Sequence, residues 1–438
     1  MRTNTKARAV KTYTHEGGRA ADHVSINNQL RRSVLACMLF EDQFYEDGKS
    51  IADRITELAA QVQPSQLSAL AVEARAKQNL RHVPLLLATV LARTGAGIPG
   101  LVSGTLEAII QRPDELSEFL ALYWRKGRTP LSAQVKKGLA AAFVKFDAYQ
   151  LAKYNRDNAI KLRDVLFLCH AKPKNEEQAA VWKQLIDGTL PSPDTWEVAL
   201  SAGKDKRATF TRLLDEGALG YLALLRNLRN MQEAGVESAK INDAIMARKN
   251  GAHRVLPFRY VAAYRAAPAY ARALNKALMD TVKELPRLPG HTIVLVDVSG
   301  SMEAKLSGKS DLTRMDAAAA LASIVPSDNV RVFSFSYKTV EVAAHEGIPG
   351  IAEIISSQLH GGTHLAQAVA AVNKLPHDRL IVITDEQATV RPPAPVAKHA
   401  YMINVASYKN GVGYGKWTHI DGFSENILRW MAEFENTQ

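Results

Sequence analysis

The sequence has 438 residues, of which 47% are hydrophobic, so it is long enough for two or three domains with sizeable cores. It contains no apolar run of about 18 residues, which excludes a transmembrane helix. The first 18 residues are basic and polar and lack the apolar stretch of a secretory signal. Two cysteines are too few for a disulfide framework or a zinc site, so we expect a protein of the reducing cytoplasm, without a membrane role.

Charge is unevenly distributed along the chain. The net charge is +11, but residues 291–438 contain 12 Lys or Arg and 15 Asp or Glu. The excess of positive charge, +14, therefore lies in residues 1–290. This bias favours a polyanionic partner, most often nucleic acid. The alternative is that the charge is spread over helix surfaces and only keeps the protein soluble.

The first two thirds of the sequence predict helices almost throughout. Residues 1–28 are polar and predict an N-terminal arm. From residue 29 onward, apolar residues recur at helical spacing, and Pro, Gly and Asn separate the segments. The expected helices span residues 30–40, 51–62, 64–78, 83–93, 101–111, 114–124, 132–146, 147–153, 162–170, 175–187, 194–202, 206–216, 219–232, 238–247, 257–266 and 269–285. Their short joints and repeat length of roughly 30 to 45 residues are typical of an α-helical HEAT-like repeat solenoid, predicted over residues 29–285.

The last third alternates between strands and helices. Pro286, Pro289 and Gly290 predict a linker into a second domain, residues 290–438. We expect strands at 292–296, 329–334, 339–343, 379–383 and 399–404, and helices at 315–324, 351–357, 365–375 and 424–434. This alternation predicts an α/β doubly wound sheet with helices on both faces.

Polar side chains follow two of these strands. The strand 292–296 ends in Asp297, Ser299 and Ser301, whose oxygens can face one point at the carboxyl end of the strand, where open α/β sheets bind ligands. Thr363 follows a Gly-rich turn, and Asp385 follows the strand 379–383. These five oxygen ligands suit a divalent cation, with Mg²⁺ expected first and Mn²⁺ or Ca²⁺ as alternatives. Ordinary strand-end turns, or an intact site without metal, are the competing interpretations.

Basic and aromatic side chains of the helical half are candidate RNA contacts. Lys and Arg neutralise phosphates, and Tyr or His can stack on an unpaired base. The candidates are Lys153, Tyr154, Arg156, Arg163, His170, Arg226, Arg229, Arg31 and Arg32. His170 could instead be a cation at a helix end, and Arg226 and Arg229, three residues apart, could form only a solvated helix face. The turn WRKGR at 124–128 places basic residues beside an aromatic one.

These motifs together resemble a known family. The segments INNQLRRSVLACMLFED, LAKYNRDNAIKLRDVLFLCHAKP and GYLALLRNLRNM look like the TROVE-domain family, the Ro autoantigen and its bacterial relatives. The oxygen site resembles the metal-ion-dependent adhesion site of von Willebrand factor A (vWA) domains. The resemblance covers residues 20 to 434 and implies a helical-repeat ring followed by a vWA domain.

The resemblance also implies a function. Such proteins bind small structured Y RNAs on a basic outer surface and single-stranded 3′ ends of misfolded non-coding RNA in a central cavity, for RNA quality control. Bacterial relatives can be tethered through a Y RNA to a 3′ exonuclease. Lys153 falls at the family's cavity lysine, and His170 falls at its histidine, seventeen residues on. Asp157 stands at the second basic position of the family, although Arg156 precedes it.

We therefore expect a monomeric, non-catalytic, cytoplasmic RNA-binding protein. No nucleophile–base pair or P-loop is evident, and Asp297 and Asp385 are assigned to the metal. The alternative is a protein-interaction scaffold whose metal site captures an acidic side chain of a partner. A metal-dependent ribonuclease is a third interpretation, disfavoured because the metal site lies outside the basic half.

Overall fold

The computed structural model describes residues 26–35, 48–305, 312–343, 346–388, 390–405, 416–421 and 426–436. Nearly all of the predicted N-terminal arm lies outside these residues. Packing divides the chain into two units, which are described separately. The helical unit comprises Ser25–Leu35 and Lys49–Leu219, and the described part of the sheet unit runs from Gly220 onward. No described helix is long and apolar enough to cross a membrane.

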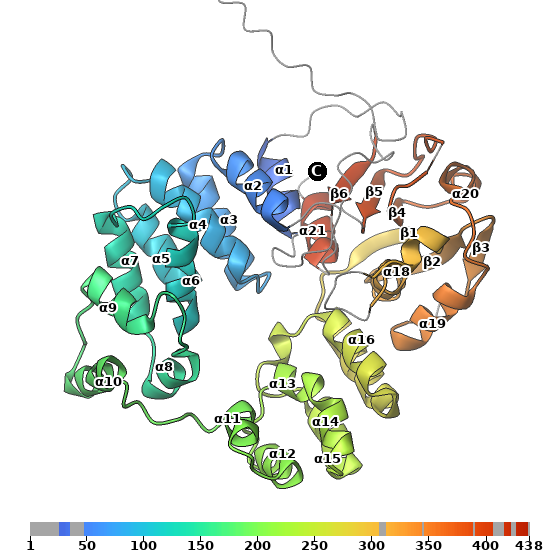
Figure 1. Ribbon diagram of the computed structural model, residues 1–438. Coiled ribbons are helices and arrows are strands. Elements are labelled where there is room, and N and C mark those ends of the chain that lie inside the picture. The colour runs from blue at the N-terminus through green and yellow to red at the C-terminus, as the bar shows by residue number, and fades with distance from the viewer. Residues whose placement is uncertain are drawn as a thin grey trace, which may run out of the picture. The chain divides into compact units, whose positions relative to one another are not determined.

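The helical unit consists of helices joined by short loops, as the sequence predicts (Figure 1). The helices are α1 (Ile26–Leu35), α2 (Gly48–Ala59), α3 (Pro64–Ala76), α4 (His82–Thr94), α5 (Leu101–Ile109), α6 (Pro113–Tyr123), α7 (Ala133–Phe143), α8 (Ala148–Tyr154), α9 (Leu162–Cys169), α10 (Glu176–Asp187), α11 (Trp196–Ser201) and α12 (Lys206–Asp215). The part of the predicted first helix that follows Leu35 lies outside the described residues.

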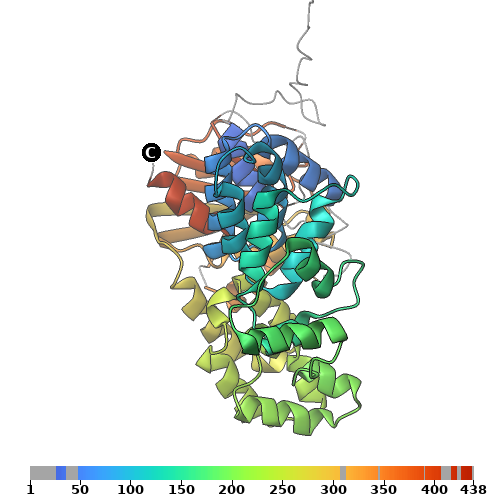
Figure 2. The ribbon, with the colours of Figure 1, turned by 90° about the vertical axis from the view of Figure 1, so that its left-hand side faces the viewer.

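These helices stack in two rows, which can be followed in Figures 1 and 2. In one row α3 packs on α5, α5 on α7 and α7 on α9; in the other α4 packs on α6 and α6 on α8. The helices α5 and α7 approach each other closely at Gly138. A Cβ at Gly138 would lie 2.8 Å from the Cβ of Leu106 and 2.9 Å from the carbonyl oxygen of Ser103. The stacked pairs confirm the predicted HEAT-like repeat architecture.

A buried carboxylate ties the two rows together at the start of α6. Glu115 is fully buried, and its carboxylate accepts hydrogen bonds from the backbone N–H groups of Gln111 (2.8 Å) and Arg112 (3.1 Å). The guanidinium of Arg75, on α3, donates to the other carboxylate oxygen at 2.7 Å. The negative charge is thus neutralised by an ion pair and by the positive end of the helix, which is the condition for burying it.

The sheet unit begins with α13 (Tyr221–Arg226), α14 (Leu228–Glu233), α15 (Ser238–Ala247), α16 (Pro257–Ala266) and α17 (Ala271–Val282). The prediction of one helix over residues 219–232 is wrong, because Asn227 separates α13 from α14. Asn227 is buried, and its side-chain amide donates to the carbonyl oxygen of Ala223 at 2.9 Å. An Asn that bonds to the preceding turn competes with the helical pattern and bends the chain.

Within its described residues, the rest of the sheet unit contains six strands and four helices. The strands are β1 (Leu288–Asp297), β2 (Ser327–Phe335), β3 (Thr339–Val342), β4 (Arg379–Thr384), β5 (His399–Asn404) and β6 (Thr418–Asp421), and the helices are α18 (Arg314–Ala322), α19 (Ile348–Ser356), α20 (Leu365–Val372) and α21 (Asn426–Glu435). The strand order is β3-β2-β1-β4-β5-β6, and only β3 is antiparallel to its neighbour. This confirms the predicted doubly wound fold.

Two features of the sheet differ from the sequence prediction. β1 begins at Leu288, so Pro289 and Gly290 lie inside the strand, at an irregularity in its pairing with β2, and do not form a linker. β6, which has four residues at an edge of the sheet, has no apolar run that would reveal it. The central strands agree with the prediction because both faces of the sheet are buried there, which gives each strand a continuous apolar run. On β1, Ile293 and Leu295 pack with α20 in one core, and the intervening Val294 is also fully buried.

Two contacts join α16 and α17 to the helices of the sheet. Arg265, on α16, forms an ion pair with Asp316, on α18. The side-chain oxygen of Asn275, on α17, accepts a hydrogen bond from the backbone N–H of Ile348 at 2.8 Å, at the start of α19. These contacts explain why the packing units divide near residue 220 and not near the predicted domain boundary at 290.

Candidate functional site

The candidate metal site, here named the oxygen site, comprises Asp297, Ser299, Ser301, Thr363 and Asp385. It lies at the carboxyl ends of β1 and β4, where the strand order reverses and open α/β sheets bind ligands. Asp297 ends β1, and Thr384 ends β4 beside it. The hydroxyl of Thr384 donates to Oδ2 of Asp297 at 2.6 Å. Asp385 follows directly, so the parallel pairing of β1 with β4 brings the two predicted carboxylates to the same edge of the sheet.

A tight turn places the two serines beside Asp297. The backbone N–H of Ser299 donates to Oδ1 of Asp297 at 2.9 Å, which closes the turn after β1. The hydroxyl oxygens of Ser299 and Ser301 lie 3.2 Å apart. Ser299 is buried and Ser301 is exposed, so the pair leads from the buried carboxylate toward solvent.

The loop that carries Thr363 lies against this turn. The backbone N–H of Gly300 donates to the carbonyl oxygen of Gly361 at 3.2 Å. Gly361 in turn donates to the hydroxyl of Ser336 at 2.8 Å, beyond the end of β2. A side chain at Gly361 would overlap the ring of Tyr337, 1.6 Å from its Cε2, so the exposed ring would have to move to accommodate it. Thr363, half-buried, is therefore held next to the serine turn.

Two buried carboxylates, Asp297 and Asp385, lie close enough in this site to interact electrostatically. Burial, and then the charge of Asp385, raise the pKa of Asp297 to about 7, against the hydrogen bonds from Ser299 and Thr384. Asp385 is fully buried, and its Oδ2 receives no hydrogen bond from any described residue. The nearest cation to that oxygen is a guanidinium nitrogen of Arg314, at 3.6 Å.

A buried carboxylate oxygen that accepts no hydrogen bond from a described residue, beside a second carboxylate and the hydroxyls of Ser299 and Ser301, fits a hard divalent cation. Within the described part of the chain, no three His, Cys, Asp or Glu side chains come together as a metal cluster. The candidate set is of another kind, because it combines two carboxylates with three hydroxyls.

The sequence did not reveal a buried pair beside the site. Glu386 follows Asp385 in a left-handed backbone conformation, with φ of 57°, and its carboxylate contacts the imidazole of His419 on β6. Both side chains are buried. The pair joins the residue after Asp385 to β6. It was missed because His419 lies on the strand that the sequence does not predict.

The predicted cavity residues lie on the helical unit. Lys153, in the last turn of α8, is exposed, and its Nζ lies 5.6 Å from the ring centre of Tyr149 and 6.0 Å from that of Tyr154. The guanidinium of Arg112 lies 4.5 Å from the ring centre of Tyr154, which is half-buried. One face of Tyr154 is therefore already covered by a cation, which leaves less of the ring for stacking on a base.

Three further candidate RNA contacts lie near the start and the end of α9. Arg156 and Arg163 are exposed, and Asp157, at the family's second basic position, forms an ion pair with Lys161 at 2.6 Å. His170 follows the last turn of α9 in a left-handed conformation, with φ of 53°, and is exposed. Both α8 and α9 pack on α6, so Lys153 and His170 belong to neighbouring elements of one unit.

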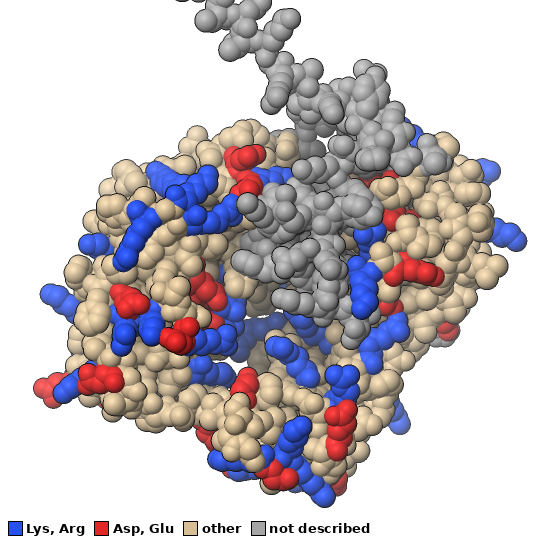
Figure 3. All heavy atoms as spheres, in the orientation of Figure 1, with Lys and Arg blue, Asp and Glu red and all other residues tan. Residues whose placement is uncertain are grey.

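The remaining predicted contacts are placed differently. Arg226 and Arg229 are exposed in the sheet unit, but they belong to α13 and α14 and do not share one helix face as expected. Arg31 forms a two-bond ion pair with Glu73 on α3, at 2.9 and 2.7 Å, which gives it a structural role. The side chain of Arg32 lies outside the described residues. On the face shown in Figure 3, Lys and Arg occur in several groups with acidic side chains between them.

The comparisons with known proteins agree with this fold. Relatives include the RNA-binding protein RO60 of Deinococcus radiodurans, 26% identical over 319 residues, which are 58% of this chain and 59% of the relative. They also include the telomerase protein component 1 of Mus musculus, 36% identical over 80 residues, 17% of this chain and 3% of the relative. The chain thus spans about three fifths of the first relative's length and a small part of the second's.

A solved structure and a family model complete the comparison. The fold matches the crystal structure of the Deinococcus radiodurans RO (RSR) protein with a TM-score of 0.69 and 19% identity, over 94% of this chain and all of that one. The family model described as TROVE domain matches residues 2–189 and 188–289, more than half of the chain. The chain therefore belongs to the TROVE domain family.

Proposed function

We propose that this chain is a Ro-like RNA-binding protein without catalytic activity. It binds small structured RNAs of the Y type on basic surfaces of its helices, and single-stranded 3′ ends of misfolded non-coding RNA near Lys153 and His170. The observation that carries the proposal is the family membership, whose Deinococcus relative is named an RNA-binding protein, combined with the +14 charge of residues 1–290.

The side chains near α8 and α9 support this proposal. Lys153, Arg156, Arg163 and His170 are exposed, and none of them forms an ion pair with a carboxylate of the described chain. The positive charges of Lys153, Arg156 and Arg163, and the hydrogen-bonding groups of all four side chains, are therefore available to phosphates. Exposed Tyr149 adds a ring that can stack on a base beside Lys153.

We further propose that the oxygen site binds a divalent cation, Mg²⁺ first. Asp297, Asp385, Ser299, Ser301 and Thr363 would hold it, and it would offer an open coordination position to an oxygen of water or of a partner. The buried Oδ2 of Asp385, which accepts no hydrogen bond from a described residue, supports this assignment. We also propose that the protein is a cytoplasmic monomer and that bound RNA links it to a 3′ exonuclease.

The double variant Lys153→Ala/His170→Ala tests the RNA site. We expect it to bind an RNA with a single-stranded 3′ tail more weakly than the wild type while its folding is unchanged, because both side chains are exposed. The matched control is Lys137→Ala with His253→Ala, which removes the same two residue types from other exposed positions. Equal affinity of wild type and double variant at moderate salt contradicts the proposed site.

A second function remains a candidate because of the side chains around the oxygen site. Tyr337 is 60% exposed and Leu359 is 86% exposed, in or beside the loops that carry the site. Exposed apolar side chains around a metal suit a protein partner that contributes a carboxylate. Salt and chelator distinguish the two functions: phosphate-driven RNA binding falls steeply with salt, whereas metal-dependent protein binding is lost in EDTA.

A further inference from the structure

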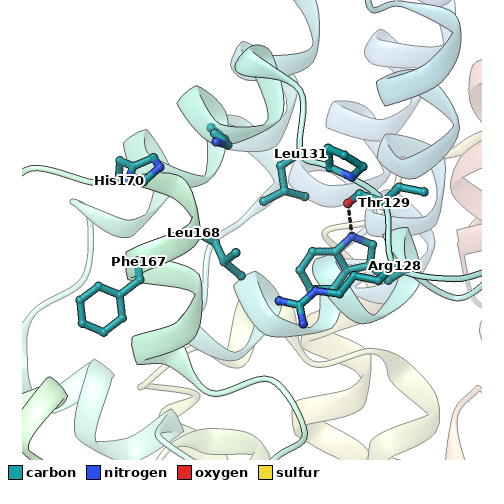
Figure 4. A pocket seen from close by; sticks show the side chains of 9 residues that line it. Arg128, Thr129, Leu131, Phe167, Leu168 and His170 are labelled. Carbon is teal, nitrogen blue, oxygen red and sulfur yellow. Dashed lines mark hydrogen bonds between the residues drawn. The ribbon is translucent and has the colours of Figure 1, made fainter.

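A groove lies between α9 and the turn that follows α6. Two adjoining cavities of about 530 and 540 Å³ share the side chains of Trp124, Arg128, Phe167 and Leu168, so they form one depression, here named the Trp124 groove. Figure 4 shows Phe167 and Arg128 on opposite sides of it, with Leu168 between them. Lys136 and His170 also line it.

One wall of the groove is built before any ligand arrives. The indole N–H of Trp124 donates to the carbonyl oxygen of Thr129 at 2.7 Å (Figure 4), and Gly127, with φ of 118°, donates to the carbonyl oxygen of Trp124 at 2.8 Å. These bonds close the turn. They hold the guanidinium of Arg128 at 4.9 Å from the ring centre of Trp124. The wall therefore presents a fixed indole and guanidinium pair.

The opposite wall is an exposed aromatic ring. Phe167 is 58% exposed, although Val165 and Leu166 beside it on α9 are buried. A large apolar side chain left in solvent next to a cavity marks a binding surface when it forms part of a patch. The acidic residue that lines the groove, Asp164, caps α9 by accepting a hydrogen bond from the backbone N–H of Lys161 at 2.9 Å.

We propose that the Trp124 groove binds an unpaired nucleobase of an RNA single strand, which contacts Phe167, Leu168 and the pair formed by Arg128 and Trp124. The adjacent phosphate lies toward Lys136 and His170. Aromatic rings and guanidinium groups stack on any base, so the subsite is tolerant of sequence.

The charge of the groove favours a nucleotide over a protein side chain. Arg128 and Lys136 form no ion pair with a carboxylate among the described residues, so both charges are free to meet a phosphate. This subsite rests on the proposed RNA-binding function and extends it from Lys153 and His170 to Trp124, Arg128 and Phe167.

Binding of two labelled oligonucleotides to the full-length protein tests the subsite. One is a single-stranded oligoadenylate RNA, and the other has the same length and phosphates but lacks bases. We expect the wild type to prefer the base-bearing RNA, and Phe167→Ala to reduce that preference on the order of tenfold while its affinity for the abasic strand stays unchanged. Phe167→Tyr should retain the preference, and Ile98→Ala, at an exposed apolar position outside the groove, is the matched control.

The outcomes separate the subsite from the broader function. If the wild type binds neither strand nor a structured RNA with a 3′ tail, RNA binding and the subsite both fail. If the wild type binds RNA but Phe167→Ala keeps the same preference for bases, the subsite alone is overturned and the groove is left for a protein side chain. Circular dichroism of Phe167→Ala confirms that a loss of preference does not reflect unfolding.

Discussion

The substitution Asp297→Asn tests the electrostatics of the oxygen site most sharply. Folding raises the pKa of Asp297 to about 7, through burial and the charge of Asp385, from an unfolded value of about 4. A carboxyl with a raised folded pKa favours the folded state below the unfolded pKa, and this contribution is lost as pH rises through about 7. Above pH 7 the metal-free protein is therefore destabilised by roughly 4 kcal/mol at this residue.

Asparagine removes the charge but keeps the shape. It keeps one of the two hydrogen bonds that Asp297 accepts, from Ser299 and Thr384, and losing the other costs about 1 kcal/mol. At pH 8 in EDTA, we therefore expect the variant to be more stable than the wild type by on the order of 2–3 kcal/mol. Near pH 4 this advantage should disappear. The wild type should gain about 2.7 kcal/mol from Mg²⁺ at a hundred times its Kd, and the variant should gain nothing.

The assay is urea unfolding of the sheet unit within the full chain, monitored by circular dichroism. It is performed at pH 4.5 and at pH 8, in each case with EDTA or with Mg²⁺. Asp328→Asn is the control, because Asp328 is an exposed carboxylate outside the oxygen site, paired with Arg287. A variant that is less stable than the wild type at pH 8 in EDTA would refute the repulsion argument. A variant that still gains stability from Mg²⁺ would refute the role of Asp297 as a ligand.

Further predictions concern packing and charge in the helical unit. Gly138→Ala should destabilise the unit by about 1–3 kcal/mol, because its Cβ would meet α5, whereas Gly104→Ala, with open space around it, should stabilise slightly; thermal melts would show both. Arg31→Ala should cost about 1 kcal/mol, through loss of the pair with Glu73, and should leave RNA affinity unchanged; a large loss of affinity would return Arg31 to the RNA interface. Lys153→Ala should reduce the slope of log affinity against log salt by about 0.7 for single-stranded RNA, and an unchanged slope would exclude a phosphate contact.

Much of the fold could be predicted because local patterns and tertiary packing agree. The helices α15 and α16 and the strand β5 match the predicted ranges. Ser238 and Pro257 mark the starts of the two helices, and a short apolar run marks the strand. The carboxylates Asp297 and Asp385 could be brought together from sequence alone, because parallel strands end at one edge of a sheet.

The remaining differences come from contacts that are distant in sequence. Nothing near Arg31 indicates that Glu73 will neutralise it, and nothing near Tyr154 indicates that Arg112 will cover its ring. The break at Asn227 depends on the hydrogen bond of a buried side-chain amide. The composition of residues 219–232 alone indicates one continuous helix. The Trp124 groove likewise joins a turn to a helix about 40 residues later, and a local pattern cannot show this.

RNA bound to the purified protein tests the central claim most directly. The protein would be purified at low salt, its nucleic acid extracted and sequenced, and an RNA with a single-stranded 3′ tail added back. The proposed function predicts one or a few small structured RNAs, enriched over a control purification, and salt-sensitive binding of the added RNA. Protein free of nucleic acid that also fails to bind the tailed RNA would contradict it, and would direct attention to a protein partner at the oxygen site.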